Sequence, residues 1–145
     1  MPVVLVVEDD DSTREGMRMA LEHSEFEVLE AASGEEAKSR LDLAPVDVVV
    51  SDVMMDRMSG VDLLDHIQKN FPDVAVILVT AYGTVEQAVE VMRRGAYEYL
   101  TQPTHLARLK LLVQPPTRRL SIFRDHPTLP EMFLLHFSAP RLGGR

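Results

Sequence analysis

The stretch Val3-Val-Leu-Val-Val-Glu-Asp-Asp10 places acidic residues directly after an uninterrupted apolar run. A second stretch, Val46-Asp-Val-Val-Val-Ser-Asp52, repeats the pattern and ends on Asp52. Runs this rich in β-branched residues are typical of strands covered on both faces of a parallel sheet. Because parallel strands end at the same edge, several carboxylates would meet there, and such a cluster is costly unless a proton or a cation joins it. The two stretches therefore predict an acidic pocket for a hard divalent cation.

The composition limits the class of protein. With 145 residues, 46% of them hydrophobic and 26% charged, the chain fits one globular domain plus a tail. The net charge of −8 argues against a nucleic-acid or anionic-membrane surface. The absence of Cys excludes disulfides, thiolate metal sites and thiol catalysis. The N-terminal apolar run is too short for a signal peptide or a membrane span, so we expect a cytoplasmic protein.

Apolar runs alternate with helix signals along most of the chain. Further strands are expected over 26–30, 74–79 and 97–100. Helices are expected to begin at Ser12, Ser33, Ser59 and Thr84, three of which have Glu or Gln at the capping-box spacing. A fifth helix is expected after Pro103, over about 106–113. Strict alternation of five strands and five helices predicts an α/β fold: a doubly wound parallel sheet with helices on both faces and ligands beyond the carboxyl ends of its strands.

The character of the chain changes near Gln114. Residues 114–145 contain five of the nine prolines, and five Arg against Asp125 and Glu131, which gives this segment a net charge of +3. It shows no sustained helical or strand period, and the Pro115-Pro116 pair should end the fifth helix. We therefore expect one domain over 1–113 and an atypical Pro/Arg-rich tail over 114–145, with no output domain.

Four motifs carry a family resemblance. They are Val6-Val-Glu-Asp-Asp10, Asp52-Val-Met-Met with Met58-Ser-Gly60, Val79-Thr-Ala-Tyr-Gly83 and Tyr99-Leu-Thr-Gln-Pro103. In order and spacing they resemble the receiver domain of two-component response regulators, most of all the nitrogen-regulation type, over residues 1 to about 113. The resemblance implies a flavodoxin-like five-stranded sheet of order 2-1-3-4-5.

The resemblance also implies a phosphoprotein of phosphorelay signal transduction. Asp52 would accept a phosphoryl group from a sensor histidine kinase. Mg²⁺ would be bound by Glu8, Asp9, Asp52 and the backbone carbonyl of Met54. Thr80 would then bind a phosphoryl oxygen. No enzymatic activity is implied beyond uptake of the phosphoryl group from a phosphodonor and self-dephosphorylation.

A switch and an output surface belong to the same resemblance. The side chain of Tyr99 would follow Thr80 inward when the phosphoryl group is bound. The face built from the fourth helix, the fifth strand and the fifth helix, about 84–113, would bind a downstream protein or a second copy of the chain. We expect neither direct nucleic-acid binding nor membrane contact.

Two positions depart from the family pattern. Gln102 stands where receivers normally carry Lys, so the phosphoryl oxygens would meet amide donors without a charge. Asp56 stands where a proline is common, in the loop after the acceptor, and should loosen that loop. Gln102 leaves open an alternative function, a pseudo-receiver that binds proteins without being phosphorylated. A phosphotransferase or phosphatase is a third alternative, but such enzymes usually carry a second Asp where this chain has Met54.

Overall fold

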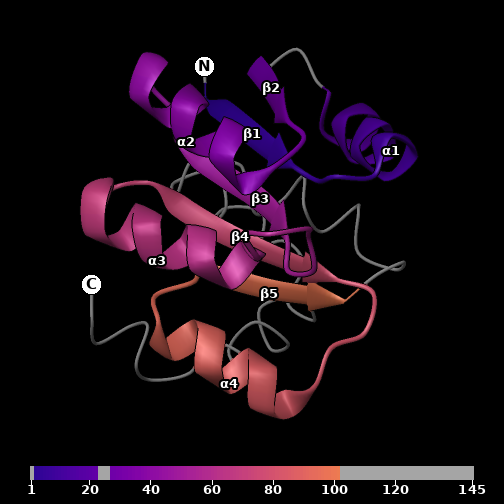
Figure 1. The fold of residues 1–145 in the computed structure, drawn as a ribbon, viewed down its shortest axis with the longest axis vertical. Helices are drawn as coiled ribbons and strands as arrows, with labels where there is room; N and C mark the ends of the chain where they lie inside the picture. Colours follow the sequence, from indigo (N-terminus) through magenta and orange to yellow (C-terminus); the bar gives the residue numbers. More distant parts are fainter. Residues whose placement is uncertain (1, 23–26, 102–145) are drawn as a thin grey trace, which may run out of the picture. The chain divides into compact units, whose positions relative to one another are not determined.

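The structure, a computed structural model, describes residues 2–22 and 27–101 (Figure 1). Gln102, the expected fifth helix and the tail over 114–145 lie outside the described residues, so the predictions made for them remain predictions. In the described ranges, strands and helices alternate in the order β1 (Val3–Val7), α1 (Asp11–Leu21), β2 (Glu27–Ala31), α2 (Gly34–Leu43), β3 (Val48–Asp52), α3 (Gly60–Asn70), β4 (Ala75–Thr80), α4 (Val85–Arg93) and β5 (Glu98–Thr101).

All five strands form one parallel sheet. Its order is β2-β1-β3-β4-β5, which Figure 1 shows from the upper to the lower part of the view. Each pair is parallel, and β1 lies between β2 and β3. The chain therefore reverses its direction of winding at β1, and the predicted doubly wound sheet of flavodoxin-like order 2-1-3-4-5 is confirmed.

Alternating side chains of the strands cover the two faces of the sheet. Leu5, Val49 and Leu78 belong to one hydrophobic cluster with buried side chains of α2, α3 and α4. Their strand neighbours Val4 and Val50 are equally buried, and because successive strand residues point to opposite faces, they lie on the other side. The buried residues of α1, Met17 and Leu21, lie outside the first cluster. Helices thus cover both faces, as predicted.

Two strands extend further toward their carboxyl ends than the apolar runs that predict them. The run over 46–50 becomes Val48–Asp52, and the run over 74–79 becomes Ala75–Thr80. Backbone hydrogen bonds continue whatever the polarity of the side chain: the N–H of Val53 still donates to the carbonyl of Val79 at 2.9 Å. Asp52 and Thr80 are therefore the last residues of rigid strands.

Helix α1 begins earlier than the capping pattern predicts. Its N-cap is Asp10, not Ser12, because Oδ2 of Asp10 accepts hydrogen bonds from the N–H and the hydroxyl of Thr13 at 2.8 and 2.7 Å. Carboxylates cap helices as well as hydroxyls do. The other three N-caps are Ser33, Ser59 and Thr84, as predicted.

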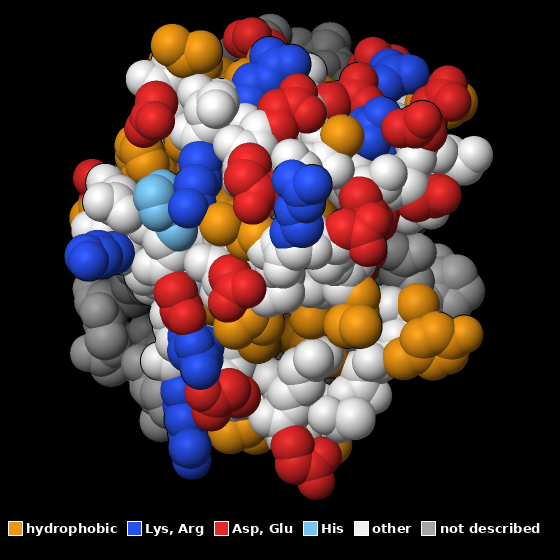
Figure 2. Space-filling model, in the orientation of Figure 1, with side chains coloured by type: hydrophobic (Ala, Val, Ile, Leu, Met, Phe, Trp, Pro, Cys, Tyr) orange, Lys and Arg blue, Asp and Glu red, His pale blue; other side chains and the backbone are white. Residues whose placement is uncertain are grey.

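Acidic and basic side chains alternate over α1, at the upper right of Figure 2. Arg14 bonds to Asp11 at 2.7 Å and to Glu30 of β2 at 3.3 Å. Ion pairs near the surface typically contribute less than about 1 kcal/mol each, but the pair with Glu30 joins α1 to the edge strand. Within the described ranges, no helix combines the length and the hydrophobicity needed to cross a membrane.

Candidate functional site

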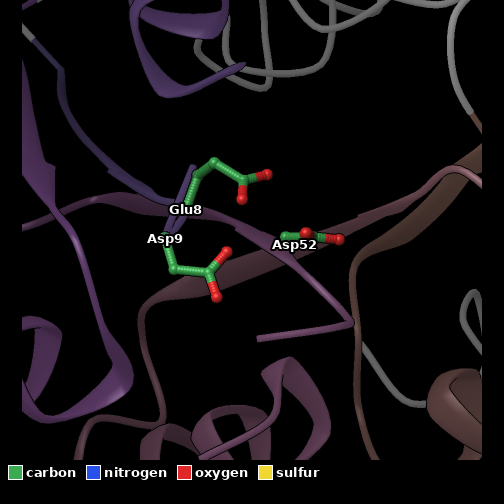
Figure 3. Close-up of side chains that lie close together, drawn as sticks. All are labelled: Glu8, Asp9 and Asp52. Carbon is green, nitrogen blue, oxygen red and sulfur yellow. The ribbon is translucent and has the colours of Figure 1, made fainter. Parts of the chain in front are cut away.

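Three carboxyl groups meet at the carboxyl edge of the sheet. Val7 pairs with Ser51, so the two residues that follow β1, Glu8 and Asp9, lie beside Asp52 at the end of β3. One carboxylate oxygen from each of the three residues lies within 4.8 Å of the others. Figure 3 shows the three carboxyl groups turned toward a common space. Residues more than forty positions apart in the chain therefore form one acidic cluster.

The three carboxyl groups differ in environment. Glu8 is only 3% exposed, and burial, opposed in part by the hydrogen bond from the N–H of Asp10, raises its pKa to about 8. Asp52 is partly buried, and burial also raises its pKa. Asp9 is exposed, and a hydrogen bond from the N–H of Asp56, at 3.0 Å, lowers its pKa.

These differences determine where a proton resides when no cation is bound. Glu8 is within hydrogen-bonding reach of both Asp9 and Asp52. A pKa this high favours the protonated form of Glu8 at neutral pH, and hydrogen bonding to Glu8 lowers the pKa of Asp52 against the effect of burial. One proton thus relieves the repulsion that three charges at this distance would create.

The cluster fits a hard divalent cation. All three side chains offer oxygen, the ligand type that Mg²⁺ and Ca²⁺ prefer, whereas softer metals favour sulfur or imidazole. Asp9 opens the cluster to solvent, which leaves room for bound water. Met54 lies two residues beyond Asp52, and its N–H donates to Oδ1 of Asp52 at 3.3 Å. Its carbonyl as a further ligand remains a prediction.

Thr80 ends the strand next to Asp52. Asp52 pairs with Val79, so Thr80 lies one residue further along β4. The hydroxyl of Thr80 is buried and bonds the backbone of Tyr82 in both directions, at 3.3 and 3.4 Å. Bonds this long are weak, so the hydroxyl is poorly satisfied by its present partner.

Tyr99 of β5 is buried, with 5% of its surface exposed. Its hydroxyl donates to Oε1 of Gln87 on α4. A Cβ added to Gly83 would lie 2.5 Å from this hydroxyl, so the chain has glycine where the tyrosine ring needs space. The inward position of Tyr99 therefore depends on the segment between β4 and α4.

Two groups that contribute to the site, the side chain of Gln87 and the backbone amide of Asp56, were not predicted from the sequence. Gln87 follows Thr84 at the capping-box spacing, and its N–H does bond Oγ1 of Thr84 at 3.0 Å, but its side chain bonds Tyr99 instead of the cap. The amide of Asp56 was missed because the one signal at this position, a residue with an N–H where proline is common, does not say which acceptor that N–H meets. Both contacts depend on how distant elements are placed.

Comparison with known proteins identifies the family. Residues 4–114 match the family described as "Response regulator receiver domain". The chain belongs to this family. Receiver domains are signalling domains of two-component response regulators and bind Mg²⁺ at an acidic pocket. The predicted nitrogen-regulation subgroup is also confirmed, since relatives of that type are among the matches.

The matches to individual relatives extend over the receiver domain of this chain. The response regulator protein PilR of Pseudomonas aeruginosa is 32% identical over 114 residues, which is 79% of this chain and 26% of PilR. The receiver domain of the Francisella response regulator 1452 has a TM-score of 0.73 and 29% identity, covering 78% of this chain and 93% of that one. The response regulator TrrA of Thermotoga maritima, solved in complex with Mg²⁺–BeF, has a TM-score of 0.70 and 30% identity, covering 78% and 96%. The chain spans about a quarter of the length of the curated relatives that it matches.

Proposed function

We propose that this receiver domain accepts a phosphoryl group on Asp52 from a phosphohistidine of a sensor histidine kinase. A carboxylate oxygen of Asp52 forms the new bond to phosphorus, the phosphorus–nitrogen bond breaks, and its electron pair returns to the imidazole ring. The observation that carries the proposal is the cluster of Glu8, Asp9 and Asp52 within 4.8 Å at the end of the strands. The product is an acyl phosphate, which water can hydrolyse.

The acidic cluster needs a counter-charge for this reaction, because the incoming phosphoryl group is itself negative. Glu8, Asp9, Asp52 and the carbonyl of Met54 are the residues proposed to hold Mg²⁺. When bound, the ion neutralises charge on the carboxylates and the phosphoryl oxygens. A cation held by Glu8 would take the place of its proton, since both compete for the same oxygens.

Thr80 and Tyr99 form the proposed switch. The long hydrogen bonds of Thr80 to Tyr82 are easily exchanged for a charge-assisted bond to a phosphoryl oxygen. Movement of Thr80 would alter the segment that carries Gly83 and Gln87, on which the buried position of Tyr99 depends. The switch then changes the surface of α4, β5 and the residues up to about 113.

Hydrophobic side chains favour a protein partner at that surface. Val85 of α4 is 76% exposed, and Tyr82, which borders that surface in the segment before α4, is 92% exposed. Figure 2 shows hydrophobic side chains at the right, beside the segment that joins β4 to α4. A downstream protein or a second copy of the chain is the proposed partner, and the cytoplasm the proposed location. We propose a signalling role without enzymatic turnover, limited to phosphoryl uptake and self-dephosphorylation.

The complete acidic cluster favours the phosphoacceptor over the pseudo-receiver. A domain that works only by docking has no need for three converging carboxyl groups, one of them buried at an energetic cost. Gln102 bears on the strength of the response, because it offers the phosphoryl oxygens no positive charge.

Incubation with acetyl phosphate and Mg²⁺, followed by intact-mass measurement, tests the proposal. The wild type should gain one phosphoryl group, and Asp52→Asn should gain none. Asp73→Asn is the matched control, because Asp73 is an exposed Asp just before β4, at the opposite end of the sheet, and should leave uptake unchanged. Uptake by Asp52→Asn would show that the acceptor is misassigned, and no uptake by the wild type would favour the pseudo-receiver.

A further inference from the structure

A backbone amide in the segment between β3 and α3 holds one of the clustered carboxylates. The N–H of Asp56 donates to Oδ2 of Asp9 at 3.0 Å. Asp9 is exposed, so without this bond its side chain would be less restrained. Proline, the common residue at this place in the family, has no N–H and cannot make the bond.

The segment that carries this amide is fixed at several points. The N–H of Gly60 donates to the carbonyl of Val53 at 2.9 Å, which closes the segment at its base. A Cβ on Gly34 of α2 would lie 2.5 Å from Sδ of Met58. The Met58 side chain therefore packs directly on α2. Arg57 has a left-handed backbone with φ of 65°, which turns the chain after Asp56. The expected loosening of this loop is therefore opposed by contacts at its start, middle and end.

We infer that the Asp56 amide is a positioning group for the cation site, an inference that rests on the proposed function. By holding one oxygen of Asp9, the amide fixes the plane of the carboxylate beside Glu8 and Asp52. A ligand that is oriented in advance loses less freedom when the cation binds. Groups that orient metal ligands typically change metal affinity 10–100-fold. The same bond ties the segment over 53–60 to the cation site.

The test compares Asp56→Pro with Asp56→Ala, because both remove the carboxylate and only proline removes the N–H. Mn²⁺ serves as the probe, since its electron paramagnetic resonance signal reports free and bound ion without any turnover. We expect Asp56→Pro to bind Mn²⁺ about tenfold more weakly than Asp56→Ala. Equal dissociation constants for the two variants would overturn the inference and leave the proposed function intact. A wild type that binds no Mn²⁺ would overturn both.

Proline also alters the local backbone, so a second comparison isolates the hydrogen bond. In an Asp9→Ala background the acceptor and one proposed ligand are both absent, so Mn²⁺ binds more weakly overall, and the two Asp56 substitutions should then bind it equally. A tenfold difference that persists in that background would assign the effect to loop distortion and overturn the inference.

Amide hydrogen exchange, followed by NMR, requires no substitution at position 56. The Asp56 amide should exchange slowly in the wild type and at least tenfold faster in Asp9→Ala, while the Leu5 amide in β1 stays protected in both. An Asp56 amide that exchanges equally fast in the two proteins would overturn the inference even if Asp56→Pro fails to fold.

Discussion

Replacing Glu8 by Gln tests the electrostatics of the pocket. Burial raises the pKa of Glu8 from 4.5 to about 8, so the folded, cation-free protein holds a proton that the unfolded chain releases. Gln has nearly the same shape and never ionises. Its carbonyl oxygen can accept the hydrogen bond that the N–H of Asp10 now donates to Glu8 at 3.0 Å. Its NH₂ group can donate to Asp52, as a protonated carboxyl can.

The sign and size of the effect follow from proton linkage. Between pH 4.5 and about 8 the folded state binds more protons than the unfolded state, so the free energy of unfolding falls as the pH rises. The pKa difference of 3.5, from 4.5 to 8, corresponds to about 5 kcal/mol at about 1.4 kcal/mol per unit. That figure is an upper limit, because the neighbouring carboxyl groups share the proton. We expect the wild type to lose about 2–4 kcal/mol over this range.

Urea unfolding in EDTA at several pH values from 5 to about 8.5 measures this loss. The other titrating groups of the chain are common to both proteins, so the difference between the wild type and Glu8→Gln reports the pocket. The variant should lose much less stability than the wild type, and Mg²⁺ at one hundred times its dissociation constant should restore about 2.7 kcal/mol to the wild type. Parallel curves for the two proteins without Mg²⁺ would refute the assignment of the proton to Glu8.

Three further predictions concern the loop after Asp52 and Gln102, which stands where receivers normally carry Lys. Gly60→Ala should lower the free energy of unfolding, measured in urea, by about 2–3 kcal/mol, because the added Cβ would lie 2.2 Å from the carbonyl oxygen of Asp52. The control is Gly16→Ala, which should stabilise α1 because a Cβ there would have nothing within 4 Å. Arg57→Val should cost about 1–2 kcal/mol because its β-branch adds to the strain of a Cβ at the left-handed φ of 65°, whereas Arg57→Gly should not; equal stability of the two would contradict this. Gln102→Lys should strengthen the chemical-shift response to beryllofluoride and Mg²⁺ by NMR, and a wild type that already responds fully would show that the charge is dispensable.

Much of the fold could be predicted because its signals are local. Apolar runs give the strands to within two residues at either end, and hydroxyl caps give three of the four described helix starts. Ser12 was wrong as a cap because Asp10, two residues earlier, offers an equally good acceptor to Thr13. The local sequence pattern alone does not show which of two nearby capping residues, here Asp10 or Ser12, begins the helix.

The candidate site was predictable in its residues and unpredictable in its chemistry. The order of the motifs brings Glu8, Asp9 and Asp52 together, but nothing in the sequence indicates that Glu8 is buried and Asp9 exposed. That difference favours the protonated form of Glu8 over that of Asp9. The hydrogen bond from Tyr99 to Gln87 could not be predicted either, because it joins a strand to a helix whose position depends on how the helix packs on the sheet.

The register of the strands has a consequence for the fidelity of signalling. Val7 lies opposite Ser51 and Asp52 opposite Val79, and a slip of one residue in either pair would send the neighbouring carboxylate to the wrong face. Under the proposed function, a copy with shifted register would lack the assembled acidic cluster and take up no phosphoryl group, so it would not compete with correctly folded copies.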